Sequence, residues 1–145
     1  MTTVNAYLNF NGNCEEAFNF YKSVIGVEFH YLSRYKDMPV QVGIPSFSPE
    51  MAEKIMHVSL AISQETLIMG SDTGGEWAPT FQQGNNFSIC ITTDSKEEAD
   101  RLFIGLSAGG QVTMPLANTF WDDYFGMFTD KFGINWMVSF PTAQQ

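Results

Sequence analysis

Residues 13–24 read NCEEAFNFYKSV, and residues 95–106 read SKEEADRLFIGL. A forward shift of 82 positions (97 − 15) places the Glu-Glu-Ala triplet of the first stretch on that of the second. In each stretch, apolar residues recur at i, i+3, i+4 and i+7, which is the spacing of one buried helix face. These stripes are Ala17, Phe20, Tyr21 and Val24 in the first stretch and Ala99, Leu102, Phe103 and Leu106 in the second. We therefore expect the chain to repeat one structural unit around two amphipathic helices.

The two helix starts carry the same signal. Asn13 is followed three positions later by Glu16, and Ser95 is followed in the same way by Glu98. This spacing is typical of a capping box, in which the two side chains satisfy free backbone N–H groups at the helix start. Gly26 and the pair at 109–110 are expected to end the helices.

Strand patterns surround both helices, with one strand before each helix and three after it. The predicted strands are residues 5–10, 27–32, 56–62 and 66–70 in the first half and 87–92, 112–116, 124–129 and 134–140 in the second. One helix with antiparallel hairpins favours an α+β fold of two tandem βαβββ modules. A chain of 145 residues corresponds to a single domain, with module one at about 1–72, a linker at about 73–85 and module two at about 86–141.

Residues 33–54 contain three prolines and predict a long loop, and loops of that length are often functional flaps or mobile segments.

The net charge is −9 with only 7 Lys and Arg, so neither nucleic acid nor an anionic membrane surface is an expected partner. No apolar run approaches a membrane span, and a cytoplasmic protein is expected. Cys14 and Cys90 are expected to be free thiols.

Three blocks of sequence carry a resemblance to a known family. They are residues 7–17 with Phe20-Tyr21, then His57 with residues 70–72, and finally residues 119–121 with residues 126–136. With these blocks the chain resembles the PhnB-like family of the vicinal oxygen chelate superfamily, which includes glyoxalase I, bleomycin-resistance proteins and extradiol dioxygenases. The resemblance covers nearly the whole chain.

The resemblance implies cupped mixed sheets, usually completed by a homodimer, with a divalent metal ion in the cup. Its ligands, typically His, Gln and Glu, come from the first and last strand of each module. In this chain those positions fall at Asn5, at Gly70 or Ser71, at Phe87 and at Met137. Such side chains do not hold a hard divalent cation, so we expect neither a metal site nor another cofactor.

His57 is the residue with the most chemical potential. It opens a predicted strand whose even members, Val58 and Leu60, belong to the core. His57 is then either a general base in the cup or a strand-end histidine that is hydrogen-bonded to the backbone or to its mate in a dimer.

Other candidates lie on the predicted cup walls. Asn5, Tyr7 and Asn9 share the polar side of the first strand, whereas their repeat mates at 87, 89 and 91 are all apolar. Trp121 and Asp123 are either a stacking wall with a polar anchor or a solvated turn. A few polar groups against an apolar lining are typical of small-molecule sites. The other interpretation is that the apolar wall is filled or buried at a dimer contact.

The sequence therefore predicts a metal-independent binder of a small, partly apolar organic molecule. The predicted ligand contacts are Tyr7, Asn9, His57, Trp121, Asp123 and Met137. The alternatives are a lyase, isomerase or dioxygenase that uses an unusual metal set or His57 as base, and a structural dimer with a collapsed cup. A ubiquinone-type methyltransferase is disfavoured, because residues 11–13 form a single-glycine turn and not a glycine-rich nucleoside loop.

Overall fold

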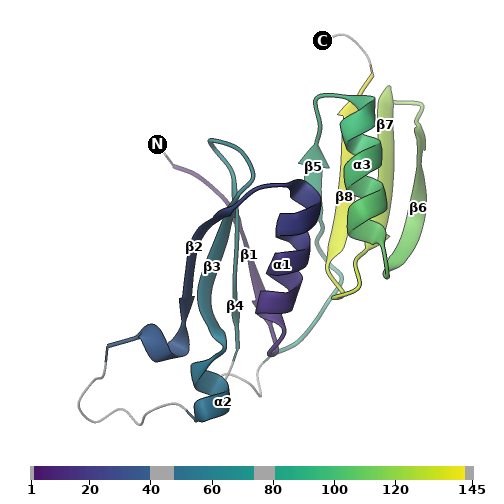
Figure 1. The fold of residues 1–145 in the computed structure, drawn as a ribbon. Coiled ribbons are helices and arrows are strands. Elements are labelled where there is room, and N and C mark those ends of the chain that lie inside the picture. Colours follow the sequence, from purple (N-terminus) through teal and green to yellow (C-terminus); the bar gives the residue numbers. More distant parts are fainter. Residues whose placement is uncertain (1, 40–47, 74–80, 143–145) are drawn as a thin grey trace. The chain divides into compact units, whose positions relative to one another are not determined.

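The computed structural model describes residues 2–39, 48–73 and 81–142. The chain divides into two compact units, unit 1 over residues 1–82 and unit 2 over residues 83–145. Each unit contains one four-stranded sheet, and in Figure 1 a long helix lies against each sheet. Among the described residues, no helix is long and apolar enough to cross a membrane.

Unit 1 has a mixed sheet in the order β1-β4-β3-β2. Strand β1 pairs in parallel with β4, and the other two pairings are antiparallel. The elements of unit 1 are β1 (Ala6–Phe10), α1 (Cys14–Ile25), β2 (Phe29–Arg34), a 3₁₀ turn (Tyr35–Asp37), α2 (Pro49–Ala52), β3 (Ile55–Ala61) and β4 (Leu67–Asp72).

Unit 2 repeats this topology in the order β5-β8-β7-β6, with β5 and β8 parallel. Its elements are β5 (Ile89–Thr92), α3 (Lys96–Ser107), β6 (Gln111–Asn118), β7 (Asp123–Thr129) and β8 (Asn135–Pro141). The α+β fold with two tandem βαβββ modules and mixed sheets is therefore confirmed. The short elements at 35–37 and 49–52 lie in the predicted loop, of which residues 40–47 are outside the described residues. Residues 74–80 of the predicted linker are also outside them.

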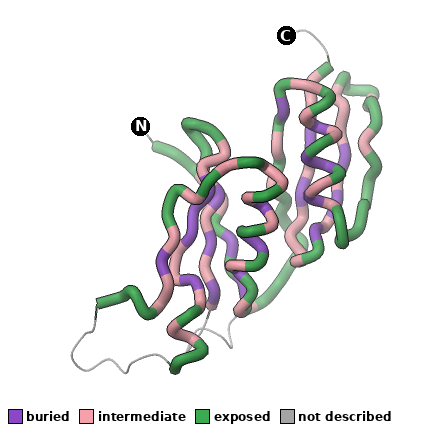
Figure 2. Tube along the Cα trace, viewed as in Figure 1, coloured by how far each residue is buried: buried purple, intermediate pink, exposed green. Residues whose placement is uncertain are grey.

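The core of unit 1 lies between α1 and the sheet, where the buried segments of Figure 2 face each other. Phe18 is fully buried and contacts the rings of Phe10 and Tyr21. The predicted apolar stripe on α1 was therefore partly wrong, because Phe18, and not Phe20, is buried on the helix face toward the sheet. A Cβ added at Gly70 would lie 2.6 Å from the Phe18 ring, so β4 needs a glycine where the helix packs this closely.

The core of unit 2 follows the predicted stripe on α3, since Ala99, Leu102, Phe103 and Leu106 are all buried. Phe103 packs edge-on against Phe128 of β7, with ring centroids 5.1 Å apart. Trp136 of β8 stacks on Phe128 and is fully buried. Its indole Nε1 donates to Asp130 Oδ2 at 2.8 Å, so the polar end of the ring is satisfied inside the core.

The two helices begin differently, although the sequence predicts one signal for both. Ser95 accepts a hydrogen bond from the Glu98 amide at 3.1 Å, as expected for an N-cap. Asn13 makes no side-chain cap. Asp72 of β4 supplies the acceptor for α1, because its Oδ1 accepts from the amides of Gly12 and Cys14 at 3.0 and 2.9 Å. The α1 cap therefore comes from a residue distant in sequence, which local spacing does not reveal.

Candidate functional site

The face of the unit 1 sheet that points away from α1 is called the outward face of unit 1. Strand register places Tyr7 beside Met69, Met69 beside Ser59, and Ser59 beside Tyr31, so one row crosses all four strands. His57 lies two residues from Ser59 on β3 and therefore points to the same face. Tyr7 is 44% and Tyr31 51% exposed, so the row offers aromatic surface to solvent.

His57 lies between two tyrosines on this face. Its Nδ1 shares a hydrogen bond of 3.3 Å with the Tyr7 hydroxyl, and the two ring centroids are 5.6 Å apart. The Tyr31 ring is 5.7 Å from the imidazole on the other side. The structure therefore shows a side-chain partner for His57, and the predicted partner in a dimer stays a prediction. The imidazole is held by side chains of its own sheet, with aromatic rings on both sides.

A buried hydroxyl lies next to His57 on the neighbouring strand. Ser33 of β2 is paired directly with His57 and is only 4% exposed. Within the described part of the chain, its Oγ has no hydrogen-bond partner. A buried hydroxyl without a partner costs free energy, so this position favours a donor supplied by water or by a ligand.

Tyr35 is held at the edge of the sheet by a bond from its hydroxyl to the Asp72 carbonyl oxygen at 2.6 Å. Burial raises the pKa of Tyr35, and the nearby Asp72 carboxylate and Tyr7 hydroxyl raise it further. Tyr35 therefore remains a protonated hydroxyl at neutral pH.

The face of the unit 2 sheet that points away from α3 is called the outward face of unit 2, and it differs in chemistry. Register places Cys90 beside Met137, Met137 beside Met127, and Met127 beside Met114. Cys90 is exposed and Met114 is 38% exposed. This face therefore carries a row of sulfur side chains where the face of unit 1 carries hydroxyl groups and rings.

Trp121 and Asp123 lie at the end of the same face. The Trp121 indole Nε1 donates to Asp123 Oδ2 at 2.9 Å. The indole also packs edge-on against Phe120 and Phe125, with centroids 4.9 and 5.8 Å away. Trp121 remains 47% exposed. The two predicted ligand contacts are thus bonded to each other, and the Asp123 carboxylate fixes the orientation of the Trp121 indole.

The predicted apolar wall on β5 was wrong. Ile89 and Ile91 pair with Trp136 and Val138, which belong to the core against α3. Cys90 lies between them and points outward. On β1 the residues that face the core have even numbers, whereas on β5 they have odd numbers. The two helices are related by a shift of 82 positions (96 − 14), and because 82 is even this shift would keep even numbers on the core side. The two strands are therefore not related by the shift that relates the helices. A slip of one residue turns every side chain to the other face of a sheet.

The residues at the metal positions implied by the resemblance do not fit a hard divalent cation. Asn5 Oδ1 accepts a hydrogen bond from the Leu67 amide at 3.0 Å and so ties β4 to the chain before β1. Phe87 precedes β5, and Met137 offers only a thioether. Among the described residues, no three His, Cys, Asp or Glu side chains come together as metal ligands. Hard cations need several oxygen or imidazole donors, and this set does not supply them.

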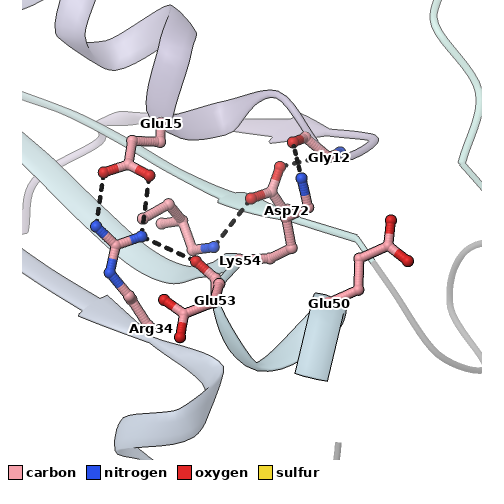
Figure 3. A pocket seen from close by; sticks show the side chains of 8 residues that line it. Gly12, Glu15, Arg34, Glu50, Glu53, Lys54 and Asp72 are labelled. Atoms are coloured by element: carbon pink, nitrogen blue, oxygen red, sulfur yellow. Dashed lines mark hydrogen bonds and ion pairs between the residues drawn. The ribbon is translucent and has the colours of Figure 1, made fainter. Parts of the chain in front are cut away.

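A polar pocket of about 440 Å³ lies at the start of α1, at the edge of unit 1 (Figure 3). Arg34 forms a two-bond ion pair with Glu15 at 2.9 and 2.6 Å, and the Lys54 ammonium donates to the Gly12 carbonyl at 2.8 Å. The carboxylate of Asp72 is held by backbone amides. Because Arg34 and Glu15 bind each other, Lys54 and Asp72 bind backbone groups, and none of the described residues that line the pocket is aromatic, we interpret it as a structural polar network and not as the site for a partly apolar molecule.

The structure brings the predicted site residues together in two groups. Tyr7 and His57 are in contact on the outward face of unit 1, and Asn9 points to the same face. Trp121, Asp123 and Met137 belong to the outward face of unit 2. Sequence reasoning missed Tyr31, Ser33 and Met69 in unit 1 and Cys90, Met114, Met127 and Phe125 in unit 2, because only the register between strands shows which face each occupies.

The comparisons with known proteins agree with this architecture. The family model described as 3-demethylubiquinone-9 3-methyltransferase matches residues 2–139. The putative 3-demethylubiquinone-9 3-methyltransferase, PhnB protein, from Bacillus cereus is 25% identical, with a TM-score of 0.71 over 96% of this chain and 99% of that one. This chain belongs to the PhnB-like family.

Two further relatives of this PhnB-like protein are similar over almost their whole length. Protein PA1353 from Pseudomonas aeruginosa is 38% identical, with a TM-score of 0.80 over 97% of this chain and 98% of that one. Protein YjdN from Escherichia coli K12 is 30% identical over an alignment 143 residues long, which covers 95% of this chain and 95% of that one. The fosfomycin resistance protein FosX from Listeria monocytogenes, at 11% identity, and a glyoxalase/bleomycin resistance protein/dioxygenase family enzyme from Burkholderia phytofirmans, at 15% identity, share the fold, and that likeness shows the fold alone.

Proposed function

We propose that this PhnB-like protein binds a small organic molecule that has a flat apolar part and a hydrogen-bonding group, without a divalent metal ion. The observation that carries the proposal is the arrangement of His57 between Tyr7 and Tyr31 on the outward face of unit 1. Exposed rings supply apolar area for a flat molecule, and hydroxyl and imidazole groups beside them orient it. Asn9 adds an exposed carboxamide at the end of the same face.

The orphaned hydroxyl of Ser33 supports a polar ligand group at this position, because a buried oxygen beside His57 lacks a donor. Trp121, Asp123 and Met137 form an outward face of their own in unit 2, and their part in binding stays a prediction. The same holds for the cytoplasmic location and for the homodimer.

The experiment is a panel of small aromatic probes, namely phenol, benzoate, benzamide and benzylamine, screened by ligand-observed NMR. We expect at least one probe to bind and to be weakened by Tyr7→Phe, His57→Ala and Tyr31→Leu. Tyr124→Phe is the matched control, because the Tyr124 hydroxyl bonds to Asp100 of α3 and not to the outward face. Equal binding by all variants, or no binding by any probe, would contradict the proposal.

The alternative is an enzyme, and the contact between Tyr7 and His57 is the observation that favours it, since a positioned imidazole is a competent general base. Elemental analysis of purified protein separates the hypotheses, because stoichiometric Zn, Mn, Ni or Fe would contradict metal-independent binding and favour a metal-dependent enzyme.

The family description also names a methyltransferase. Saturable binding of S-adenosylmethionine would support that activity, although neither sheet is the doubly wound parallel sheet in which a glycine-rich turn holds a nucleotide.

A further inference from the structure

Two exposed aromatic rings lie beside two carboxylates in the turn between β6 and β7. Phe120 is 93% and Trp121 47% exposed, and their ring centroids are 4.9 Å apart with the ring planes at 89°. Asp122 and Asp123 follow directly in the chain. We call these four residues the aromatic turn. The face of an aromatic ring is electron-rich, so the rings and the carboxylates attract the same class of ligand, which is a cation.

Hydrogen bonds hold the aromatic turn in place. The Trp121 indole donates to Asp123 Oδ2 at 2.9 Å, and the Asp123 amide donates to Thr119 Oγ1 at 3.1 Å. The Thr142 amide donates to the Asp122 carbonyl oxygen at 2.8 Å. The backbone of Asp122 is left-handed, with φ at 65°. An indole that is fixed before binding loses little side-chain entropy when a ligand arrives.

The described part of unit 2 does not neutralise the negative charge of the aromatic turn. Residues 83–145 contain only three Lys and Arg. All three cations contact other residues: Lys96 lies over the Tyr124 ring, Arg101 pairs with Glu98, and Lys131 lies over the Phe132 ring. Among the described residues, no Lys or Arg forms an ion pair with Asp122 or Asp123. The charge of the aromatic turn is therefore complementary to a cation from outside the chain.

We propose that the aromatic turn binds a small organic cation that carries a quaternary ammonium group. The methyl groups of such a cation contact the Phe120 and Trp121 rings, and its positive charge is stabilised by the ring faces and by the carboxylates. A metal ion does not fit, because no three metal-ligating side chains come together among the described residues. This inference does not rest on the proposed function, which concerns unit 1.

The test compares the binding of choline to the full chain with that of dimethylbutanol, the uncharged molecule in which carbon replaces the nitrogen of choline. We expect choline to bind at least about threefold more tightly, because only the charged molecule gains the cation–π attraction. Nitrogen–proton correlation NMR should show a shift of the Trp121 indole N–H signal, which Trp121→Leu identifies by its loss. Added salt should weaken choline and leave dimethylbutanol unchanged.

Two variants remove one charge each and keep the turn. Asp123→Asn retains an oxygen that accepts from the Trp121 indole, and Asp122→Asn retains a residue type that tolerates the left-handed backbone. Each variant should weaken choline by about twofold or more, as expected for the loss of an exposed charge pair. Glu97→Gln is the matched charge control, because Glu97 is exposed in the first turn of α3.

The contribution of the Phe120 ring has its own control. Phe120→Leu should weaken choline, whereas Phe87→Leu should not, because Phe87 is also exposed, at 58%, but precedes β5. Far-UV circular dichroism checks the fold of each variant. The proposal is overturned if dimethylbutanol binds as tightly as choline, if neither molecule binds, or if Glu97→Gln weakens choline as much as Asp123→Asn. A choline-induced shift that spares the Trp121 signal would also overturn it.

Discussion

Asp72 Oδ1 lies 2.9 Å from the backbone nitrogen of Cys14, so the last residue of β4 caps the first residue of α1. The same carboxylate accepts from Gly12 through Oδ1 and from Ile55 through Oδ2, at 3.0 and 2.9 Å. Asp72 is 1% exposed. One buried carboxylate thus joins the β1–α1 turn, the helix start and the beginning of β3, and the stability of unit 1 depends on it.

Replacing Asp72 by Ala should destabilise unit 1 by about 3 kcal/mol, because three backbone N–H groups then lose their acceptor at roughly 1 kcal/mol or more each. Asp72→Asn keeps one carboxamide oxygen and should lose less. Urea unfolding followed by far-UV circular dichroism measures the change, since the described tryptophans, Trp121 and Trp136, both lie in unit 2.

The matched control for this prediction is Asp94→Ala, an exposed aspartate in the turn before α3. It should change the free energy of unfolding by less than about 0.5 kcal/mol, as surface substitutions usually do. If Asp72→Ala unfolds with the same midpoint as Asp94→Ala, the carboxylate does not hold unit 1 together.

The two thiols should differ sharply in reactivity. Cys90 is exposed, whereas Cys14 is buried and its thiol has a raised pKa, so less thiolate forms there. A disulfide reagent such as dithiobisnitrobenzoate should modify one thiol quickly in the native protein and the second only after denaturation. Cys90→Ser should abolish the fast phase. Rapid modification of both thiols in the native parent protein would contradict this account.

The ion pair between Glu15 and Arg34 should make a small, pH-dependent contribution to stability. The hydrogen bond from Arg34 is the main cause that lowers the pKa of Glu15. A lowered carboxyl pKa in the folded state means that the stabilisation is present above the unfolded value of about 4.3 and is lost as the pH falls through the folded value. Glu15 is 45% exposed, so solvent reduces the effect to about 0.5 kcal/mol at pH 7.

Glu15→Gln measures this contribution by urea unfolding at pH 7 and at pH 3. The difference from the parent protein should be present at pH 7 and should shrink toward zero at pH 3. Glu97→Gln, on an exposed residue in the first turn of α3, is the control for the general effect of removing one negative charge. A difference that grows toward pH 3 would mean that the sign of the pKa change is wrong.

Much of the fold could be predicted because it rests on local periodicity. The stripe on α3 identifies its buried face correctly, and alternation along β3 places Val58 and Leu60 in the core. The turn glycine Gly26 adopts the left-handed conformation that ends α1. These are properties of residues close together in sequence, where helix and strand geometry leave few alternatives.

The candidate site was less predictable because it depends on pairing between distant strands. Tyr7 and His57 are 50 residues apart, and their contact follows from the position of β4 between their strands. Tyr31 and Ser33 lie on β2, and irregularities in the register occur at both ends of its pairing with β3. Simple alternation along the sequence therefore does not predict which β2 residues point outward. The Asp72 cap was missed for the same reason, since its partners are 58 and 60 residues away.

The residues that face the core have even numbers on β1 and odd numbers on β5. This difference constrains any attempt to move a function from one half of the chain to the other. If the outward residues of β1, Tyr7 and Asn9, were copied into the second half by superimposing the Glu-Glu-Ala triplets, they would arrive at positions 89 and 91, whose paired neighbours lie in the core against α3. An engineer would first have to delete or insert one residue between β5 and its helix. The two halves are thus copies in topology, but their surfaces are not interchangeable parts.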